Sequence, residues 1–425
     1  MSNFQFEHPA DQIVYFMKRI YDGGMTTTSG GNLSILDSDG NMWISPGGID
    51  KGTLRREDIV CVKADGSIVG RHKPSSEYPF HRAIYRMRND VRAILHAHPP
   101  ALVSFSIAGR VPETASTPTI HAICGGVGFA PYDVPGSDGL GEKVGAEFRK
   151  GFQVILLENH GACVAGTDML QAFERFETLD FAARMLTAAT VLGTPATLSG
   201  QQLAEAAGRC EMAEFTPQVR SSGELEARRC MAELMRRAYR QKLFTAAEGT
   251  VAVRLDGDRF LISPAKIDRA GATPGEMVLV AEGRREAGRI PCGMVDQVRS
   301  IFAAQPDLGA VIVANPPHLA AYGVAGVKFD PRVIPESYIL LRELPAFPFG
   351  ALAEAAAKIS PRYPIVQVDS RCVISSGRNL LEAFDRLEVA EYSARATIAA
   401  RNFGGMQPIN EAQVADLVKA FHLIP

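Results

Sequence analysis

The sequence lacks the features of exported and membrane-embedded proteins. Its seven cysteines are scattered, odd in number and without CxxC spacing, which argues for reduced thiols rather than a disulfide framework. The first residues, MSNFQFEHPADQ, lack both the basic segment and the apolar segment of a signal peptide. No apolar run approaches the roughly 20 residues that a membrane helix needs. We therefore expect a cytoplasmic protein with no membrane partner.

An excess of charge of one sign is also missing. Lys and Arg together number 45 and Asp and Glu 47, so the formal net charge is −2. This balance gives no electrostatic footprint for nucleic acid, and we expect a small-molecule substrate instead. The 425 residues, of which 46% are hydrophobic, suffice for two globular domains of about 200 residues each.

The sequence does contain an internal repeat, at an offset of about 217 residues. The repeated segments are ISPGGID (44–50) with ISPAKID (262–268), NDVRAILHAHPPALVSFSIAG (89–109) with PDLGAVIVANPPHLAAYGVAG (306–326), and LQAFERFE (170–177) with LEAFDRLE (381–388). Two copies of one fold are therefore expected, each a sheet layered with helices. The predicted boundaries are a first domain at 1–205, a linker at 206–222, a second domain at 223–404 and a tail at 405–425.

The first copy carries a candidate metal site. Residues 92–95, RAIL, read as a buried strand that leads into His96 and His98. Because side chains alternate along a strand, the two imidazoles should point to the same face. A third histidine, His160, follows a second apolar strand, QVILL. Three neutral imidazoles would hold a divalent ion and leave it an open position for substrate.

A candidate base, Glu77, precedes these histidines in a predicted helix. The pair Ser75 and Ser76 suits the N-cap of that helix, which would put Glu77 in its first turn. His81 lies four residues later on the same helical face and could contact Glu77. A simpler interpretation is also open, because HxH pairs occur as packed histidines and a first-turn glutamate is often only a favourable charge.

As a set, these motifs resemble the class II aldolase/adducin family, typified by fuculose-phosphate aldolase. The similar motifs lie within about residues 10–200 and are SGGNLS (29–34), ISPGGID (44–50), PSSE (74–77), HAHP (96–99) and ENHG (158–161). The resemblance implies an α/β fold with three layers, α/β/α, around a central mixed, largely antiparallel sheet, here present twice in tandem. It also implies one divalent metal per chain on His96, His98 and His160, zinc before manganese or iron, and Glu77 as acid/base. Family members are tetramers, so we expect a homo-oligomer, a dimer or tetramer of tandem chains.

The resemblance also suggests residues that bind the substrate. The family's aldolases hold a sugar phosphate with regions that correspond here to Gly31, Asn32, Gly48, Ser75 and Ser76. Backbone N–H groups of a glycine-rich loop and serine hydroxyls suit a phosphate or carboxylate. The alternative is that SGGN is only a tight turn and that the serines only cap the helix.

Two departures from the family pattern bear on the reaction. This chain has Gly47 where the aldolases usually place Thr or Ser, so one hydroxyl donor to phosphate is missing. It has Ala122 after Ile120-His121, where fuculose-phosphate aldolase has a tyrosine acid, and Tyr132 is the candidate substitute. Both losses keep a decarboxylase open as an alternative.

The second copy has kept the apolar pattern and lost the chemistry. Aligning the copies pairs Asn32 with Thr250, Glu77 with Met294, His96 with Val313, His98 with Asn315, and His160 with Arg371. A set without histidine cannot hold zinc by the usual ligand rules, so the second copy is expected to be degenerate.

The predicted function is a metal-dependent lyase. It would cleave a carbon–carbon bond through a metal-stabilised enediolate or enolate, as an aldolase acting on a sugar phosphate or a related hydroxy-carbonyl compound. One alternative is a metal-dependent decarboxylase of a hydroxy-aryl or keto carboxylate. Another is a non-catalytic binding or scaffold protein like adducin, which four converging functional side chains argue against.

Overall fold

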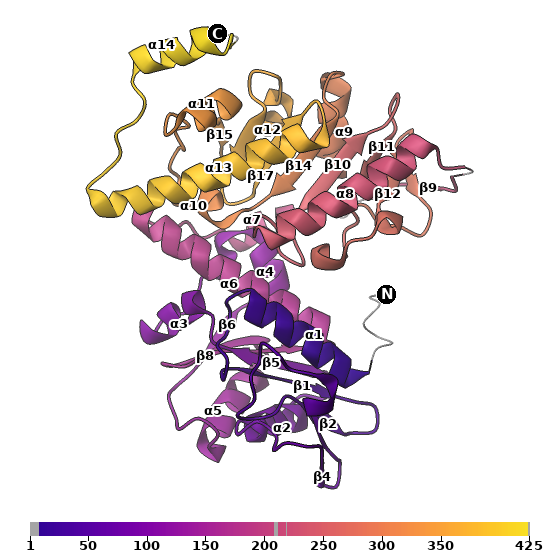
Figure 1. Cartoon of the computed structure of the whole chain (residues 1–425), viewed down its shortest axis with the longest axis vertical. Helices are drawn as coiled ribbons and strands as arrows, with labels where there is room; N and C mark the ends of the chain where they lie inside the picture. The colour runs from indigo at the N-terminus through magenta and orange to yellow at the C-terminus, as the bar shows by residue number, and fades with distance from the viewer. Residues whose placement is uncertain (1–7, 208–210, 218, 424–425) are drawn as a thin grey trace. The chain divides into compact units, whose positions relative to one another are not determined.

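The computed structural model describes residues 8–207, 211–217 and 219–423 (Figure 1). The described chain forms two compact units. Unit 1 contains the residues up to Thr114 and residues 119–183, and unit 2 contains residues 115–118 and those from Arg184 onward. The division falls inside a long helix, α6 (Met169–Leu192). The domain boundaries at residues 205 and 223 stay a prediction.

Unit 1 is built on an eight-stranded sheet with the order β4-β3-β2-β1-β5-β8-β7-β6. Only β6 and β7 are parallel; the other neighbours are antiparallel, so the sheet is mixed and largely antiparallel as expected. The strands are β1 (Asn32–Leu36), β2 (Met42–Ile44), β3 (Val60–Val62), β4 (Ile68–Val69), β5 (Ala93–Ala97), β6 (Val127–Ala130), β7 (Val154–Leu157) and β8 (Gly161–Gly166).

Helices cover both faces of this sheet and give the three layers that the resemblance implied. α2 (Tyr78–Met87) and α5 (Asp138–Arg149) pack on one face, in a core cluster that includes Ile84, Ile94 and Val144. The other face carries α1, α3 and α6 (Figure 1). α1 runs over Pro9–Asp22, α3 over Pro100–Ile107, and a short α4 over Pro118–Cys124.

Unit 2 repeats the sheet of unit 1 strand by strand. Its nine strands follow the order β15-β16-β17-β14-β10-β11-β12-β13-β9, which reversed is the order of unit 1 with β9 added at one edge. The strands are β9 (Glu214–Phe215), β10 (Thr250–Arg254), β11 (Phe260–Ile262), β12 (Val278–Ala281), β13 (Arg284–Glu286), β14 (Ala310–Ala314), β15 (Ala346–Phe347), β16 (Ile365–Val368) and β17 (Cys372–Gly377). The helices are α7 (Gly200–Ala206), α8 (Ser222–Arg240), α9 (Val295–Ala304), α10 (Pro317–Ala325), α11 (Pro335–Leu341), α12 (Leu352–Lys358), α13 (Leu380–Ala400) and α14 (Glu411–Ala420).

The strand registers confirm the alignment of the two copies. Asn32 pairs with His96 between β1 and β5, and Thr250 pairs with Val313 between β10 and β14. Short 3-10 turns also accompany the sheets, for example Arg56–Asp58 in unit 1 and Pro274–Glu276 in unit 2. The tandem duplication is thus present in the topology as well as in the sequence.

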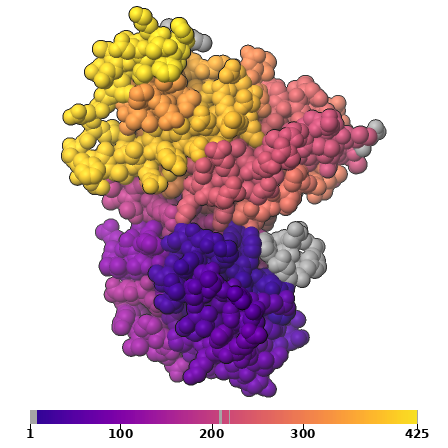
Figure 2. Space-filling model, viewed as in Figure 1, coloured from indigo at the N-terminus to yellow at the C-terminus, as the bar shows by residue number. Residues whose placement is uncertain are grey.

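Three further expectations concern the C-terminal tail, the cysteines and membrane-spanning helices. The tail forms one helix, α14, which buries none of its residues fully and lies as yellow spheres on the outside of unit 2 in Figure 2. The six cysteines that the structure describes are all free thiols; Cys210 lies outside the described residues. Within the described chain, no helix is long and apolar enough to cross a membrane.

Candidate metal centre

The ends of two adjacent strands of unit 1 carry the three histidines. His96 lies within β5, and His98 follows the strand directly. β8 begins at Gly161, so His160 comes one residue before it. Because β5 and β8 are antiparallel, the end of one strand lies beside the start of the other and brings the three side chains together.

The three histidines converge on a common point. Their candidate ligand atoms all lie within 4.8 Å of one another, and the Nε2 atoms of His96 and His98 are 2.9 Å apart. Glu77 closes the group, with Oε2 3.3 Å from His96 Nε2 and Oε1 3.5 Å from His160 Nε2. The structure therefore brings together all four residues that the sequence singled out.

Hydrogen bonding and burial prepare the imidazoles to act as ligands. His96 Nδ1 lies 3.0 Å from the carbonyl oxygen of Ala162 and donates to it, which leaves a lone pair on Nε2. Burial lowers the pKa of His96 to about 3, with a further lowering by His160. Burial also lowers the pKa of His98 to about 3. Both rings are therefore neutral at pH 7, the form that binds a metal ion.

Two glycines make room for the ring of His98. A Cβ atom on Gly161 would lie 2.5 Å from His98 Cδ2, and one on Gly30 would lie 2.9 Å from His98 Nδ1. Gly31, at a φ of +73°, brings its backbone against the carbonyl of His96. The SGGN loop is therefore shaped around the histidines rather than being only a turn.

These residues fit a divalent ion. Metal–nitrogen bonds of about 2.0–2.1 Å in a tetrahedral site place neighbouring donor atoms about 3.3 Å apart, close to the spacing seen here. Glu77 Oε1 is buried and has no hydrogen-bond partner, which is the environment expected beside a cation or a reacting substrate. Three imidazoles suit zinc or iron better than manganese, which prefers oxygen ligands.

The predicted capping of α2 is wrong in detail. The helix begins at Tyr78, so Glu77 itself is the N-cap residue rather than a first-turn residue, and it makes no side-chain cap. Pro79 causes this shift, because proline is favoured in the first helical turn and its fixed φ sets the start there. Ser75 does not cap the helix; its Oγ accepts a hydrogen bond from the backbone N–H of Glu77 at 3.3 Å.

The predicted substrate residues fall into two groups. Ser76 and Gly48 are exposed, and the bridge between Pro46 and Pro74 joins their two loops. Ser75 and Asn32 are buried, and Asn32 Nδ2 donates to Glu77 Oε2 at 2.8 Å. Asn32 thus contacts the predicted base, while the role of the whole set toward an anion stays a prediction.

Tyr132 lies in the loop between β6 and α5. Its side chain is 54% exposed, and its backbone N–H donates to the carboxylate of Glu158 at 2.8 Å. This contact ties the loop to the ENHG segment that carries His160. The catalytic role of Tyr132 stays a prediction.

Sequence reasoning missed two polar residues behind the site. They are Ser34, whose Oγ lies 2.7 Å from His81 Nδ1, and Tyr85, whose Oη lies 2.8 Å from Ser34 Oγ inside the core. Strand alternation puts Ser34 on the same face as Asn32, and helical spacing puts Tyr85 one turn after His81. The sequence contains both patterns, but they indicate a contact between these residues only when β1 is known to lie beside α2.

The equivalent position in unit 2 is filled by side chains. Asn315, in the place of His98, donates to Glu248 at 2.7 Å and to the carbonyl of Arg371 at 2.9 Å. Glu248 stands where unit 1 has Gly30, and Cys372 stands where it has Gly161. Across the described residues, the only cluster suited to a metal ion is His96, His98 and His160. That the second copy is degenerate stays a prediction.

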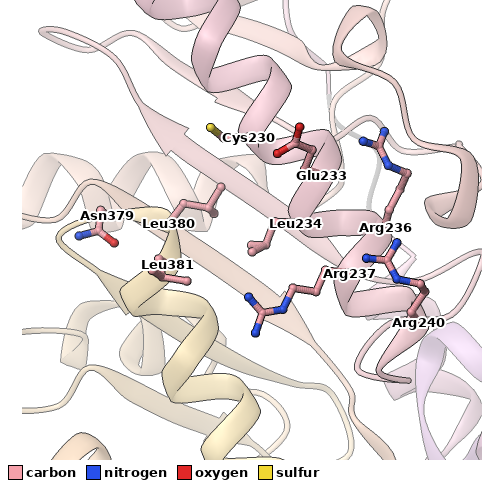
Figure 3. A pocket seen from close by; sticks show the side chains of 9 residues that line it. All are labelled: Cys230, Glu233, Leu234, Arg236, Arg237, Arg240, Asn379, Leu380 and Leu381. Atoms are coloured by element: carbon pink, nitrogen blue, oxygen red, sulfur yellow. The ribbon is translucent and has the colours of Figure 1, made fainter.

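Unit 2 has a separate surface hollow between α8 and the start of α13 (Figure 3). It encloses about 620 Å³ and is bordered by Arg236, Arg237 and Arg240. Arg237 stacks on Phe384, the same contact that Arg19 makes with Phe173 in unit 1. Arg237 therefore makes a packing contact common to both units, and we assign no ligand to the hollow.

Comparison with known proteins places this geometry in context. The chain is 30% identical over 204 residues to the 5-deoxy-D-ribulose 1-phosphate aldolase of Bacillus thuringiensis serovar kurstaki, covering 47% of this chain and 94% of that protein. It is 34% identical over 170 residues to the 3-oxo-tetronate 4-phosphate decarboxylase of Pectobacterium atrosepticum, covering 39% and 78%. A solved structure of L-fuculose 1-phosphate aldolase is 29% identical, covering 47% of this chain and 93% of that one, with a TM-score of 0.43.

The relatives named are lyases, in agreement with a carboxylate beside three imidazoles. The family described as Class II Aldolase and Adducin N-terminal domain matches the sequence twice, at residues 11–187 and 229–398. The protein is therefore a lyase that belongs to the class II aldolase and adducin family, with two copies of the family's domain in one chain.

Proposed function

We propose that unit 1 is a divalent-metal-dependent lyase that cleaves a carbon–carbon bond of a sugar phosphate or a related hydroxy-carbonyl compound. The observation that carries this proposal is the buried carboxylate of Glu77 beside the three imidazoles, with Oε1 free of hydrogen bonds. A divalent ion on His96, His98 and His160 would supply a Lewis acid toward two oxygens of such a substrate.

Glu77 supplies the proton transfer. In aldol cleavage the hydroxyl on the β carbon loses its proton, the α–β bond breaks, and the electron pair remains on the α carbon beside the carbonyl. Glu77 must therefore enter cleavage protonated: it donates that proton to the carbon and ends as a carboxylate, and in the synthetic direction the carboxylate removes the same proton. Tyr132 stays the predicted partner for the hydroxyl proton. Glu77 is only 7% exposed, which shields its carboxylate from bulk water.

The exposed loops beside the site favour an anionic substrate. A Cβ on Gly47 would lie only 3.7 Å from the backbone N of Ser76, so the two loops pack closely. Gly48 and Ser76 are both open to solvent there. Backbone N–H groups at such a junction bind phosphate or carboxylate groups well. The relatives named above act on phosphorylated compounds, which supports the same substrate class.

A decarboxylase is the second candidate. It needs the same parts, because loss of carbon dioxide also leaves an electron pair on a carbon beside a carbonyl. The specific observations in its favour are Ala122 in the place of the aldolase tyrosine and a decarboxylase relative at 34% identity. The substrate would then be a keto or hydroxy-aryl carboxylate, whose carboxylate leaves in place of an aldehyde.

A substrate screen tests both candidates. The purified protein, with zinc, manganese or iron added separately, is incubated with sugar phosphates and with keto and hydroxy-aryl carboxylates. Release of an aldehyde supports the aldolase, and release of carbon dioxide supports the decarboxylase. Metal analysis belongs to the same experiment, since a scaffold like adducin should hold no stoichiometric divalent ion.

Assembly and location stay predictions. We propose a homo-oligomer, a dimer or tetramer of tandem chains, and a cytoplasmic location, the latter suggested by the six free thiols. Light scattering on the whole chain tests the first, and a stable, fully active monomer would contradict it.

A further inference from the structure

A continuous row of buried hydrogen bonds runs from Glu77 into the core of unit 1. Glu77 Oε2 accepts from Asn32 Nδ2 at 2.8 Å, and Asn32 Oδ1 lies 2.5 Å from His81 Nε2. His81 Nδ1 lies 2.7 Å from Ser34 Oγ, which in turn lies 2.8 Å from Tyr85 Oη. We call Glu77, Asn32, His81, Ser34 and Tyr85 the buried row.

The row is isolated from solvent. His81 and Ser34 are 0% exposed, Asn32 is 2% exposed, and Tyr85 is 8% exposed. Tyr85 Oη also donates to the backbone carbonyl of Ser34 at 3.0 Å, which anchors the far end to β1. Because water cannot rearrange these contacts, the protein alone decides which atoms donate.

The hydrogen bonds can run in one direction only. Burial lowers the pKa of His81 to about 3, helped by His96 and opposed by Glu77, so the ring is neutral at pH 7 and carries one proton. Asn32 presents its N–H to the carboxylate and its oxygen to His81, so His81 Nε2 must donate. Its Nδ1 then accepts from the hydroxyl of Ser34. Each donor from Ser34 to Asn32 therefore points toward Glu77, while the single O–H of Tyr85 is directed at Ser34, whose Oγ and carbonyl oxygen both lie within hydrogen-bond distance.

Unit 2 is an internal control for what the fold itself requires. Aligned with the row, it has Met294, Thr250, Val298, Ala252 and Phe302. Ala252, Val298 and Phe302 all belong to one hydrophobic core cluster of unit 2. The same sheet and helices therefore form without the row. Unit 2 lacks the residues of the row and also lacks the predicted metal ligands.

We propose that the buried row is a positioning device for the proton transfer, with His81 as its central residue. It holds Oε2 of Glu77 through Asn32 and so leaves Oε1 as the oxygen that exchanges a proton with the substrate. Oε1 has no hydrogen-bond partner within the described chain, as this role needs. The inference rests on the proposed function, because it assigns a proton-transfer role within that reaction.

Kinetics of five variants, Glu77→Gln among them, test the proposal. The probe is exchange of an α-proton of dihydroxyacetone phosphate with D₂O, followed by NMR, in the whole chain loaded with zinc. His81→Leu should slow exchange at least about 10-fold, the scale for a partner behind a reactive group, with metal content and KM unchanged. His81→Gln, whose amide can still donate to Asn32, should recover most of the rate. Ser34→Ala and Tyr85→Phe, which install the residues of unit 2, should show successively smaller losses.

The possible outcomes separate the two proposals. If Glu77→Gln abolishes exchange while His81→Leu exchanges at the wild-type rate, the row has no catalytic part and only this inference fails. If Glu77→Gln also exchanges normally, or the wild type does not exchange at all, the proposed proton transfer itself is wrong. If His81→Leu does not fold, Ser34→Ala decides, because unit 2 tolerates alanine at that position.

A spectroscopic measurement tests the row without any substrate. Protein labelled with ¹⁵N-histidine should show His81, identified by its loss in His81→Gln, as a neutral ring protonated at Nε2 from pH 5.5 to 8. A ring protonated at Nδ1, or on both nitrogens, would reverse the direction of the row and overturn the inference.

Discussion

The two units share a skeleton but place their buried polar groups differently. The N-cap residues of α2 and α9, Glu77 and Met294, have nearly the same backbone angles, with φ and ψ of −92° and 4° against −89° and 9°. Unit 1 buries the imidazole of His96 in β5 and the carboxylate of Glu77 beside it. Unit 2 buries charge elsewhere, where Arg228, 1% exposed, pairs with Glu224 and Glu286.

The difference shows that the site is not part of what makes this fold stable. Buried polar groups cost free energy unless they are paired, and unit 1 meets that cost with the buried row and an ordered imidazole cluster. In unit 2 the same positions hold Val298, Val313 and Phe302, which pack as ordinary core residues. A function therefore explains the polar groups of unit 1 better than stability does.

Replacing a predicted metal ligand should give the largest difference between the two units. His96→Ala should lower metal affinity by more than about 100-fold, beyond the usual loss for a partner behind the ligands, and remove activity. Val313→Ala, at the matching position of unit 2, should leave the metal in place. Metal analysis after dialysis measures both. One full equivalent of metal in His96→Ala would show that the ligands lie elsewhere.

Removing the acid/base while keeping its shape should have the next largest effect. Glu77→Gln keeps the volume of the side chain and should retain metal while turnover falls roughly 10²-fold, the usual scale for a positioned acid or base. Met294→Gln is the matched control in unit 2. Steady-state rates on the substrate found by the screen measure this loss, and near-normal turnover would assign the role to Tyr132 instead.

Acid should affect the two units differently. Burial holds the pKa of His81, His96 and His98 near 3, while the same groups in the unfolded chain titrate near 6.5. The unfolded state therefore binds more protons between these values, and unit 1 loses stability as pH falls from about 6.5 toward 3, by up to about 1.4 kcal/mol per pH unit for each histidine.

The fluorescence of the single tryptophan, Trp43 in β2, reports this loss in metal-free protein, because it lies in unit 1. Hydrogen exchange of peptides from unit 2, whose matching residues do not titrate in this range, is the control. Equal acid sensitivity of the two units would contradict the assignment of the loss to these histidines.

A single methyl group should give the smallest effect. Gly161→Ala places a Cβ 2.5 Å from His98 Cδ2 and 2.6 Å from the carbonyl of Ala97, so His98 must move. We expect about 10-fold weaker metal binding and a loss of about 1–3 kcal/mol, the usual cost of overpacking. Cys372→Ala is the control, since unit 2 already carries a side chain there. Metal titration with unchanged affinity would show that His98 is not a ligand.

The sequence predicts those parts of the site that follow from local patterns. His96, His98 and His160 were found because each comes at or just after an apolar strand. The start of α2 was misplaced by a residue or more because Pro79 outweighs the capping tendency of Ser75. The contacts that the sequence did not predict join segments that lie far apart along the chain.

Ser34 and Tyr85 were missed because they lie 51 residues apart and meet only through the packing of β1 against α2. Which oxygen of Glu77 is held, and by what, likewise depends on the register of Asn32 opposite His96. The identity of the substrate is set by groups at exposed loops such as Gly48 and Ser76, where neither periodicity nor packing constrains the sequence.

The glycines beside His98 have a consequence for the history of the chain. Glu248 and Cys372 occupy, in unit 2, the space that a histidine at position 315 would need, since the matching Cβ atoms in unit 1 would lie 2.9 and 2.5 Å from that ring. Reversion at position 315 alone would therefore meet a steric clash and restore nothing. Recovering a metal site in unit 2 would therefore require changes at positions 248 and 372 as well as at 315.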